Sequence, residues 1–319
     1  MTQAEEPRLE RVVVLEGGIS SEREVSLLSG RGVKEALASK GLEVESWDPA
    51  VDSVGSLEEG AYDAAFIALH GTLGEDGSVQ GLLNCIGLPY TGPGVTASAI
   101  AMDKELTKNI WRANGISVPA GVRLTAAASD AELERAIAEF GADGVVVKPG
   151  HDGSSIGVTK IDRDALSLHS LRAALNAAAE RDALEVLVEE YIHGREFTVA
   201  ILDGKALPVI EICAPEGSYD FQNKYYTDVV RYECPAKLPE ASAKALAAAC
   251  EKAFAVLGCR GWSRVDALER ADGTFALLEI NTSPGMTPHS LVPMAARAVG
   301  LSYADLCLRV LGLARTDIA

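Results

Sequence analysis

The sequence predicts an α/β protein built from α+β lobes, and three observations support this fold class. The chain has 319 residues, which is more than a single hydrophobic core usually serves. In its first hundred residues, short apolar runs alternate with amphipathic segments, a rhythm typical of a parallel sheet covered by helices. From about Glu196 onward, apolar runs separated by turn residues follow one another, which is typical of an antiparallel sheet.

The first expected unit covers residues 1–102 and contains a small parallel sheet. Its strand candidates are three apolar runs: Val12–Leu15, Val44–Trp47 and Ala64–Leu69. Ser21 and Glu24 have the spacing of a capping box for the helix between the first two strands. Because the loops after parallel strands meet at one edge of a sheet, Glu22 and the loop that starts at His70 are expected close together.

Two further units are expected at residues 103–192 and 193–319. The second unit begins with a helix at Lys104–Asn114, and its strand candidates are Gly144–Lys148 and Leu184–Tyr191. The strands and helices of the third unit are expected at Phe197–Leu202, Ala206–Ile212, Ala241–Leu257, Ser263–Leu268, Phe275–Ile280 and Leu291–Val299. The polar, aromatic segment Pro215–Cys234 is long enough to form a lid over a site.

Composition and charge exclude several classes of protein. A hydrophobic share of 48% with 24% charged residues is ordinary for a globular chain and excludes wholesale disorder. A net charge of −17 argues against nucleic acid or an anionic membrane as a partner. The six cysteines lack zinc-ligand spacing and suggest reduced, mostly buried side chains in a cytoplasmic protein. We expect neither a signal peptide nor a membrane span.

An anionic ligand would need local positive charge, and Lys148 with the loop behind it is the best candidate for holding a phosphate. The sequence contains no P-loop and no dinucleotide fingerprint. Lys148 ends a strand candidate, and the following loop, Pro149–Gly157, includes Ser154, Ser155 and three glycines whose N–H groups can face an anion. A Gly-rich turn without a ligand is the alternative, and the sequence leaves it open.

The most informative pattern is a hairpin near the C-terminus. Asp272-Gly273 is a two-residue turn signal between two apolar strands. Carried outward from that turn, the register places Asp266 opposite Glu279 and Arg264 opposite Asn281. Since side chains alternate along a strand, all four are expected on one face.

This face of the hairpin predicts a metal site. Two opposed carboxylates repel one another unless a cation lies between them. Asp266, Glu279 and Asn281 form an all-oxygen set, which suits Mg²⁺ better than zinc or copper. The alternative is that the acids turn into solvent, but Leu268 and Leu277, expected on the same face, argue against it. A metal-bound nucleotide would be the natural companion of such a site.

Six segments, in order along the chain, resemble D-alanine–D-alanine ligase. They are Glu22–Ser26, His70–Gly77, Met102–Lys104, Lys148–Gly157, Gly261–Asp266 and Glu279–Met286. The resemblance extends from about Val13 to Tyr303, and six motifs in one order make it highly specific. It implies the ATP-grasp fold, with ATP between two α+β lobes and a Rossmann-like parallel-sheet domain at the N-terminus.

The resemblance also implies a reaction. ATP phosphorylates the carboxylate of one D-alanine, and the amine of a second D-alanine attacks the acyl phosphate, which releases ADP and phosphate. Phosphorylation is needed because a carboxylate would otherwise have to expel oxide. The product, D-alanyl-D-alanine, serves peptidoglycan synthesis. The implied cofactors are ATP and Mg²⁺, with two metal ions and with Mn²⁺ as a possible substitute.

The matching positions carry family roles over to this chain. The metal positions are Asp266, Glu279 and Asn281, in agreement with the hairpin. The catalytic positions are Glu22, Ser154, Tyr225, Arg264, Gly285 and Ser290, and the substrate-binding positions are His70 and Leu291. The ATP positions are Lys104, Lys148, Ser155, Glu189, Glu190, Ile192, Glu196 and Lys224.

Several of these residues also have an ordinary structural explanation. Glu22 could be only an acid in the first turn of a helix, and His70 only a solvated loop residue. Ser154 and Tyr225 could be a turn hydroxyl and a lid aromatic. The family often has Lys where this chain has Glu190, so at that position only a backbone contact to adenine is expected to survive.

Three alternative functions stay open at this point. A D-alanine–D-lactate ligase is disfavoured because such relatives tend to have Phe at the place of Tyr225. Another ATP-grasp carboxylate–amine ligase or a nucleotide-binding module without catalysis would also fit parts of the pattern. The expected partners are ATP, D-alanine and a second copy of the chain, in the cytoplasm.

Overall fold

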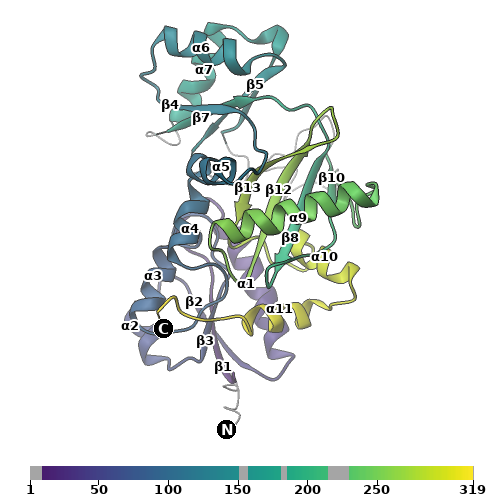
Figure 1. Cartoon of the computed structure of the whole chain (residues 1–319). Coiled ribbons are helices and arrows are strands. Elements are labelled where there is room, and N and C mark those ends of the chain that lie inside the picture. Colours follow the sequence, from purple (N-terminus) through teal and green to yellow (C-terminus); the bar gives the residue numbers. More distant parts are fainter. Residues whose placement is uncertain (1–8, 151–156, 181–184, 215–229, 319) are drawn as a thin grey trace.

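The computed structural model describes residues 9–150, 157–180, 185–214 and 230–318. The described residues form three sheets that follow one another along the long axis of the molecule (Figure 1). One sheet lies in each of the three ranges expected from the sequence. The division of the chain into three domains at those boundaries remains a prediction.

The first sheet confirms the parallel architecture expected at the N-terminus. Its strands pair in the order β2-β1-β3, all parallel, and are β1 (Arg11–Leu15), β2 (Glu43–Trp47) and β3 (Ala64–Ile67). The accompanying helices are α1 (Arg23–Ala38), α2 (Gly55–Glu59), α3 (Ser78–Cys85) and α4 (Val95–Met102). The capping box predicted at Ser21 and Glu24 is wrong, because Glu22 is the N-cap residue of α1 and makes no side-chain capping bond.

The second sheet is antiparallel, in the order β4-β7-β5-β6. Its elements are β4 (Gly121–Leu124), α6 (Asp130–Phe140), β5 (Gly144–Pro149), β6 (Thr159–Asp162), the 3₁₀ turn η1 (Arg163–Ala165), α7 (Leu168–Ala179) and β7 (Val186–Glu190). Helices α6 and α7 were not predicted. Both begin with a capping box, from Ser129 with Glu132 and from Ser167 with Ser170, so a local signal for their starts was present.

The third sheet has the order β11-β10-β8-β12-β13, with β9 paired to β8. Its elements are β8 (Glu196–Leu202), β9 (Lys205–Ala206), β10 (Ile210–Cys213), β11 (Arg231–Glu233), α9 (Glu240–Val256), β12 (Trp262–Glu269) and β13 (Phe275–Asn281). Helix α9 and the preceding helix α5 (Lys104–Ala113) share one hydrophobic core with this sheet, in which Trp111 and Phe197 are fully buried. Figure 1 shows α5 between the second sheet and the rest of the molecule.

The last two helices return to the first sheet. Helices α10 (Leu291–Ala298) and α11 (Tyr303–Leu311) share a core with β1, β3 and the end of β8, and Arg315 pairs with Tyr90. No single helix among the described residues is long and apolar enough to cross a membrane. Together α10 and α11 reach that length and composition, but they are bent by 107° and carry several fully buried side chains of the shared core.

The hairpin of β12 and β13 confirms the predicted pairing at one end and corrects it at the other. Arg264 pairs with Asn281, and Asp266 with Glu279, as expected. The turn, however, has three residues instead of two, because Gly273 N–H donates to Arg270 O at 2.9 Å, with Gly273 at φ +80°. A register shift between Asp266 and Ala267 then takes up the extra residue.

The same shift changes the face on which one apolar side chain lies. Leu277 is 1% exposed and packs in the core with Val265 and Ile280, on the side opposite Asp266. Its predicted position beside the acids is therefore wrong.

Candidate active site

Asp266 is the centre of the polar face of the hairpin. Arg264 donates to it twice, from Nε to Oδ1 at 2.9 Å and from Nη2 to Oδ2 at 2.7 Å. Asn281 Nδ2 donates to Oδ2 at 3.1 Å, and the Thr198 hydroxyl of β8 donates to Oδ1 at 2.5 Å. The structure therefore brings two predicted site residues, Arg264 and Asn281, together around the buried carboxylate of a third, Asp266.

Glu279 faces the start of α5. Its Oε2 lies 3.6 Å from Lys104 Nζ, the first residue of that helix. Asp103 fixes the helix start, since its side chain accepts from the N–H groups of Glu105 at 3.1 Å and Leu106 at 2.9 Å. A cleft next to this pair is lined by Gly71, Glu75, Ala101, Met102, Lys104, Glu279, Ile280, Asn281 and Thr282.

The donor set of this cleft fits a hard divalent cation. Asp266, Glu279 and Asn281 offer oxygen ligands of the kind that Mg²⁺ prefers. The 3.1 Å between the Asn281 amide end and Asp266 Oδ2 matches the roughly 3 Å between neighbouring ligands of an octahedral Mg²⁺, once the amide is turned to present its oxygen. The buried Thr282 hydroxyl in the cleft wall has no hydrogen-bond partner. Among the described residues no group of three His, Cys, Asp or Glu side chains gathers, and this set holds two carboxylates and an amide.

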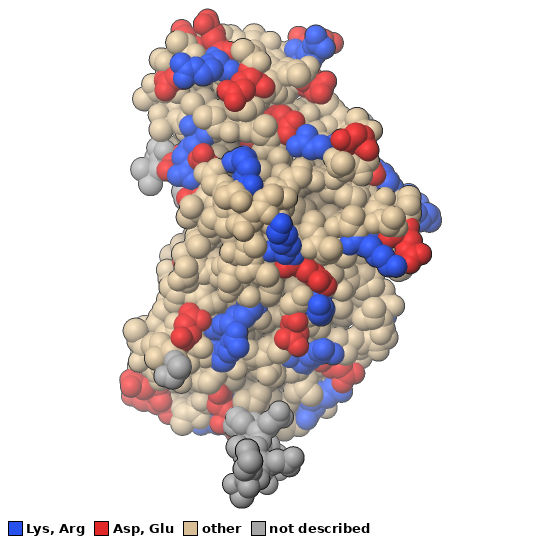
Figure 2. All heavy atoms as spheres, in the orientation of Figure 1, with Lys and Arg blue, Asp and Glu red and all other residues tan. Residues whose placement is uncertain are grey.

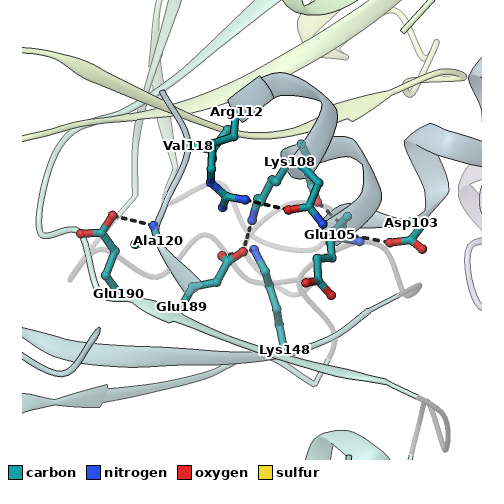
Figure 3. Close-up of polar contacts among 12 residues, drawn as sticks. Asp103, Glu105, Lys108, Arg112, Val118, Ala120, Lys148, Glu189 and Glu190 are labelled. Atoms are coloured by element: carbon teal, nitrogen blue, oxygen red, sulfur yellow. Dashed lines mark hydrogen bonds and ion pairs between the residues drawn. The ribbon is translucent and has the colours of Figure 1, made fainter. Parts of the chain in front are cut away.

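Lys148 and Glu189 lie together with a third residue, Lys108, that is not among the predicted site residues (Figure 3). Glu189 Oε2 lies 2.7 Å from Lys148 Nζ, and its Oε1 contacts Lys108 Nζ. Burial opposes ionisation of Glu189, but the two ammonium groups outweigh it and lower the pKa of the carboxyl to about 2. Lys148 stays charged, because the pull of Glu189 and Glu279 outweighs burial and raises its pKa.

Glu190 has a partner that explains its departure from the family pattern. Arg270 of the hairpin donates to it from Nη1 at 3.1 Å and from Nη2 at 2.6 Å, and the Ala120 N–H donates to Oε1 at 2.8 Å. The side chain is therefore used within the protein, between the second and third sheets.

The N-terminal sheet adds a second group of charges to the cleft. The Glu75 carboxylate accepts from Gly71 N–H at 2.9 Å and from Ser283 N–H at 3.0 Å. Burial and the nearby Glu22 raise the pKa of Glu75 to about 7, against the pull of these N–H groups and of Arg264. Glu22 and Arg264, far apart in the sequence, thus act on the same buried carboxyl.

His70 is buried and both of its ring nitrogens are used. Nδ1 lies 2.7 Å from Ser283 O, so it carries the proton and donates. Nε2 lies 3.2 Å from Ser29 Oγ, which itself accepts from Met286 N–H at 3.1 Å and donates to the ring. Burial lowers the pKa of His70 and favours this neutral form. The alternative that His70 is only a solvated loop residue is wrong, because the side chain is buried and connects the first sheet to the loop that carries Gly285.

Gly285 and Ser290 are neighbours on that loop. A Cβ on Gly285 would lie 3.2 Å from Ser290 Oγ. Ser290 is the N-cap residue of α10, as predicted, but its hydroxyl accepts from Thr287 N–H at 3.1 Å and makes no capping bond. Leu291 opens the helix and is buried.

The remaining predicted residues lie between β7 and the start of β8 or outside the described residues. Ile192 is buried just after β7, and Glu196 is the first residue of β8. Ser154, Ser155, Lys224 and Tyr225 lie outside the described residues, as does most of the segment 215–234.

Three polar residues of the site were missed in the sequence. Lys108 follows Lys104 at the spacing of one helical turn, a signal that could have found it. Glu75 lies inside a motif that resembles the family, but its contact with Ser283 joins residues 208 apart in the sequence. Thr198 had no local signal, because its position opposite Asp266 depends on the pairing of β8 with β12.

Comparison with known proteins gives a consistent result. The family described as D-ala D-ala ligase N-terminus matches residues 45–93, and D-ala D-ala ligase C-terminus matches residues 110–312. The chain is 52% identical over 314 residues to the D-alanine–D-alanine ligase of Acidovorax ebreus (97% of this chain, 92% of the relative). It is 50% identical over 323 residues to that of Delftia acidovorans (100% and 96%).

A solved structure agrees with these sequence matches. The D-alanine–D-alanine ligase of Bacillus anthracis in complex with ATP superposes with a TM-score of 0.81 at 33% identity, over 95% of this chain and 97% of that one. The ATP-grasp fold expected from the sequence is thereby confirmed. This chain therefore belongs to the D-alanine–D-alanine ligase family.

Proposed function

We propose that this ATP-dependent ligase joins two molecules of D-alanine in the cleft between the first sheet, α5 and the β12–β13 hairpin. The arrangement that carries the proposal is the meeting of Arg264, Asp266 and Asn281 with the buried acids of the N-terminal loops. A carboxylate to be activated, an oxyanion to be stabilised and a phosphate to be bound all need such convergent charges. The product is D-alanyl-D-alanine, which the family supplies for peptidoglycan.

The acyl-transfer end of the site has three parts in this proposal. Glu22 binds the ammonium of the first D-alanine, whose carboxylate accepts the phosphoryl group of ATP. Arg264 and the Gly285 N–H stabilise the oxyanion formed when the second amine attacks the acyl phosphate, and its collapse re-forms the carbonyl and expels phosphate. The start of α10, at Ser290 and Leu291, holds the carboxylate of the second D-alanine through its N–H groups. Ser154 and Tyr225 are assigned to closing the site.

The nucleotide end of the site relies on lysines. Lys104 and Lys148 bind the phosphates of ATP, joined by Ser155 and Lys224. Glu189 and the backbone of Glu190 and Ile192 meet the adenine, and Glu196 the ribose. Asp266, Glu279 and Asn281 would hold Mg²⁺, which supplies charge neutralisation on the transferred phosphate. The protein residues orient the phosphates and exclude water.

Three further assignments belong to the same proposal. The domains are residues 1–102, 103–192 and 193–319, with ATP between the last two. The enzyme acts as a homodimer, which sedimentation equilibrium would test. It acts in the cytoplasm, where ATP is present and its six unpaired cysteines stay reduced.

A product analysis tests the function. Purified enzyme with ATP and Mg²⁺ is expected to release phosphate when D-alanine is added and to form D-alanyl-D-alanine. L-alanine should support no release, and D-lactate offered with D-alanine should yield little ester. Equal turnover with L-alanine would contradict the function, and ester as the main product would identify a D-alanine–D-lactate ligase.

A further inference from the structure

Two lysines of α5 lie on one side of the helix, each facing a different lobe. Lys104 and Lys108 are four residues apart, so their side chains project from the same face. Like charges at this spacing repel unless anions lie nearby. Lys104 lies 3.6 Å from Glu279 of β13, whereas Lys108 contacts Glu189 of β7.

The Glu189 carboxylate joins two ammonium groups. One oxygen contacts Lys108, and the other lies 2.7 Å from Lys148 (Figure 3). The side chains of Lys108, Glu189 and Lys148 are 3%, 5% and 12% exposed. Lys148 is therefore the member of the cluster that a ligand reaches most readily. Glu279, which lines the cleft, also attracts Lys148.

Glu189 shares its negative charge between two ammonium groups. Lys108 and Lys148 both contact its carboxylate, so each lysine weakens the pull of Glu189 on the other. Burial lowers the pKa of Lys108 to about 7, with Lys148 acting in the same direction and Glu189 against both. An ion pair that only fastened α5 to β7 would be neutral with Lys108 and Glu189 alone.

We propose that Lys108 is a positioning residue of the nucleotide site, which neutralises Glu189 so that the charge of Lys148 remains available to the phosphates of ATP. The inference rests on the proposed role of Lys148 as a phosphate ligand. Lys108 itself touches no substrate. Lys108 acts on Lys148 through the carboxylate of Glu189, which both lysines contact. It lies one turn along α5 from Lys104.

The test compares the binding of ATP with that of adenosine, which has the base and ribose but no phosphate. The measured quantity is the ratio of the Kd of adenosine to the Kd of ATP, by calorimetry with Mg²⁺ and without D-alanine. Lys108→Met is expected to lower this ratio about tenfold or more. This is the size expected for losing the attraction between one positive charge and the phosphates in a partly buried site. Lys108→Arg, which keeps the charge, should stay within about twofold of the wild type.

Two variants of Glu189 separate charge balance from loss of structure. Glu189→Gln alone is expected to raise the ratio, because both lysines then act on the phosphates. The double variant Lys108→Met with Glu189→Gln should return the ratio to within about threefold of the wild type, because Lys148 is no longer neutralised. If Lys108→Met does not fold, Glu189→Gln and the double variant still show through the same Kd ratio whether the charge of Glu189 limits the action of Lys148.

Lys34→Met provides a matched control. Lys34 pairs with the mostly buried Glu16 at 2.5 Å next to the first sheet, and neither residue lines the cleft, so its loss removes a partly buried ion pair outside the nucleotide site. It should leave the ratio unchanged. An unchanged ratio in Lys108→Met, or a double variant no better than the single one, would overturn the inference. Absence of D-alanine-dependent phosphate release in the wild type would instead count against the proposed function.

Discussion

Asp266 both orients a neighbouring side chain and belongs to the proposed metal site, so activity is expected to depend on it more than on any other single residue of the site. It orients Arg264 through two hydrogen bonds and belongs to the oxygen set that fits Mg²⁺. Asp266→Asn is therefore expected to lower D-alanine-dependent phosphate release about 100-fold or more. Glu279→Gln should lower it as well, with a higher Mg²⁺ requirement. Steady-state assays across a Mg²⁺ series measure both.

Glu269 on the same strand supplies the control for these variants. It pairs with Arg195 at 2.7 Å, away from the cleft. Glu269→Gln should change turnover by less than about twofold. Undiminished turnover in Asp266→Asn would refute the metal assignment.

The ionisation of Glu75 should make the stability of the folded protein depend on pH. Its pKa of about 7 in the folded protein exceeds the ordinary value of 4.5, so the folded state binds more protons between these two values. Its contribution to stability is therefore present at low pH and is lost as the pH rises through 7. Glu75→Gln removes this titration, so the stability of the wild type relative to the variant should fall by up to about 3 kcal/mol between pH 5 and 8.

Urea unfolding at several pH values measures this difference. The exposed Glu58→Gln on α2 controls for the pH dependence of the rest of the molecule. A stability difference between wild type and Glu75→Gln that does not change with pH would contradict the raised pKa.

At the scale of elements, the pair of Glu190 and Arg270 fastens β7 to the hairpin. Glu190→Lys places two cations together and should destabilise the protein by about 1–2 kcal/mol, a range reduced for the partial exposure of both side chains. Adding Arg270→Glu reverses the pair and should recover more than half of the loss. A double-mutant cycle by urea unfolding measures the coupling.

The exposed pair of Glu240 and Lys244 on α9 is the matched control for this cycle. Its side chains are 82% and 75% exposed, and reversing them should change stability by less than about 0.5 kcal/mol. Strictly additive effects of the two substitutions at Glu190 and Arg270 would show that their pairing contributes nothing.

The connection from β7 to β8 depends on a glycine for a different reason. A Cβ on Gly194 would lie 1.7 Å from Glu269 O, so the chain passes directly over the backbone of the hairpin. Gly194→Ala should lower the free energy of unfolding by about 2–3 kcal/mol. Gly55→Ala, where a Cβ would meet only Ser53 Oγ at 4.0 Å, should be nearly neutral. Equal midpoints of thermal unfolding for the two variants would contradict the close approach.

At the scale of the whole molecule, charge is distributed differently on the surface and in the cleft. On the face shown in Figure 2, Lys and Arg lie among Asp and Glu without a broad area of one sign. The chain as a whole carries −17, yet Lys104, Lys108, Lys148 and Arg264 gather around the cleft. The net acidity therefore describes the molecule as a whole, whereas near the cleft these cations are paired with the carboxylates of Glu279, Glu189 and Asp266.

Binding ATP between lobes should stabilise the whole molecule. A ligand present at about 100 times its Kd adds about 2.7 kcal/mol, which corresponds to several degrees in Tm for a chain of this size. ATP with Mg²⁺ is expected to raise the Tm more than ATP with EDTA, and adenosine least. Equal shifts with and without Mg²⁺, measured by scanning calorimetry, would argue against metal-assisted phosphate binding.

Local patterns in the sequence determined most of the strands and several helices. The apolar runs of the first sheet and the helix at Lys104 are confirmed almost to the residue, because burial and periodicity act over short stretches. The pairing of Asp266 with Glu279 was also predicted, although by two compensating errors. A turn longer by one residue and a one-residue register shift cancel before the polar end of the hairpin.

The way in which residues distant in the chain share charge depends on the three-dimensional fold. Lys108 and Glu189 are 81 residues apart, and His70 and Ser283 are 213 apart, so no local pattern relates them. The return of α10 and α11 to the first sheet likewise depends on packing against a surface that exists only after folding. The sequence determined which side chains are available, because that is local chemistry. Which of them neutralise one another was decided by the approach of separate elements.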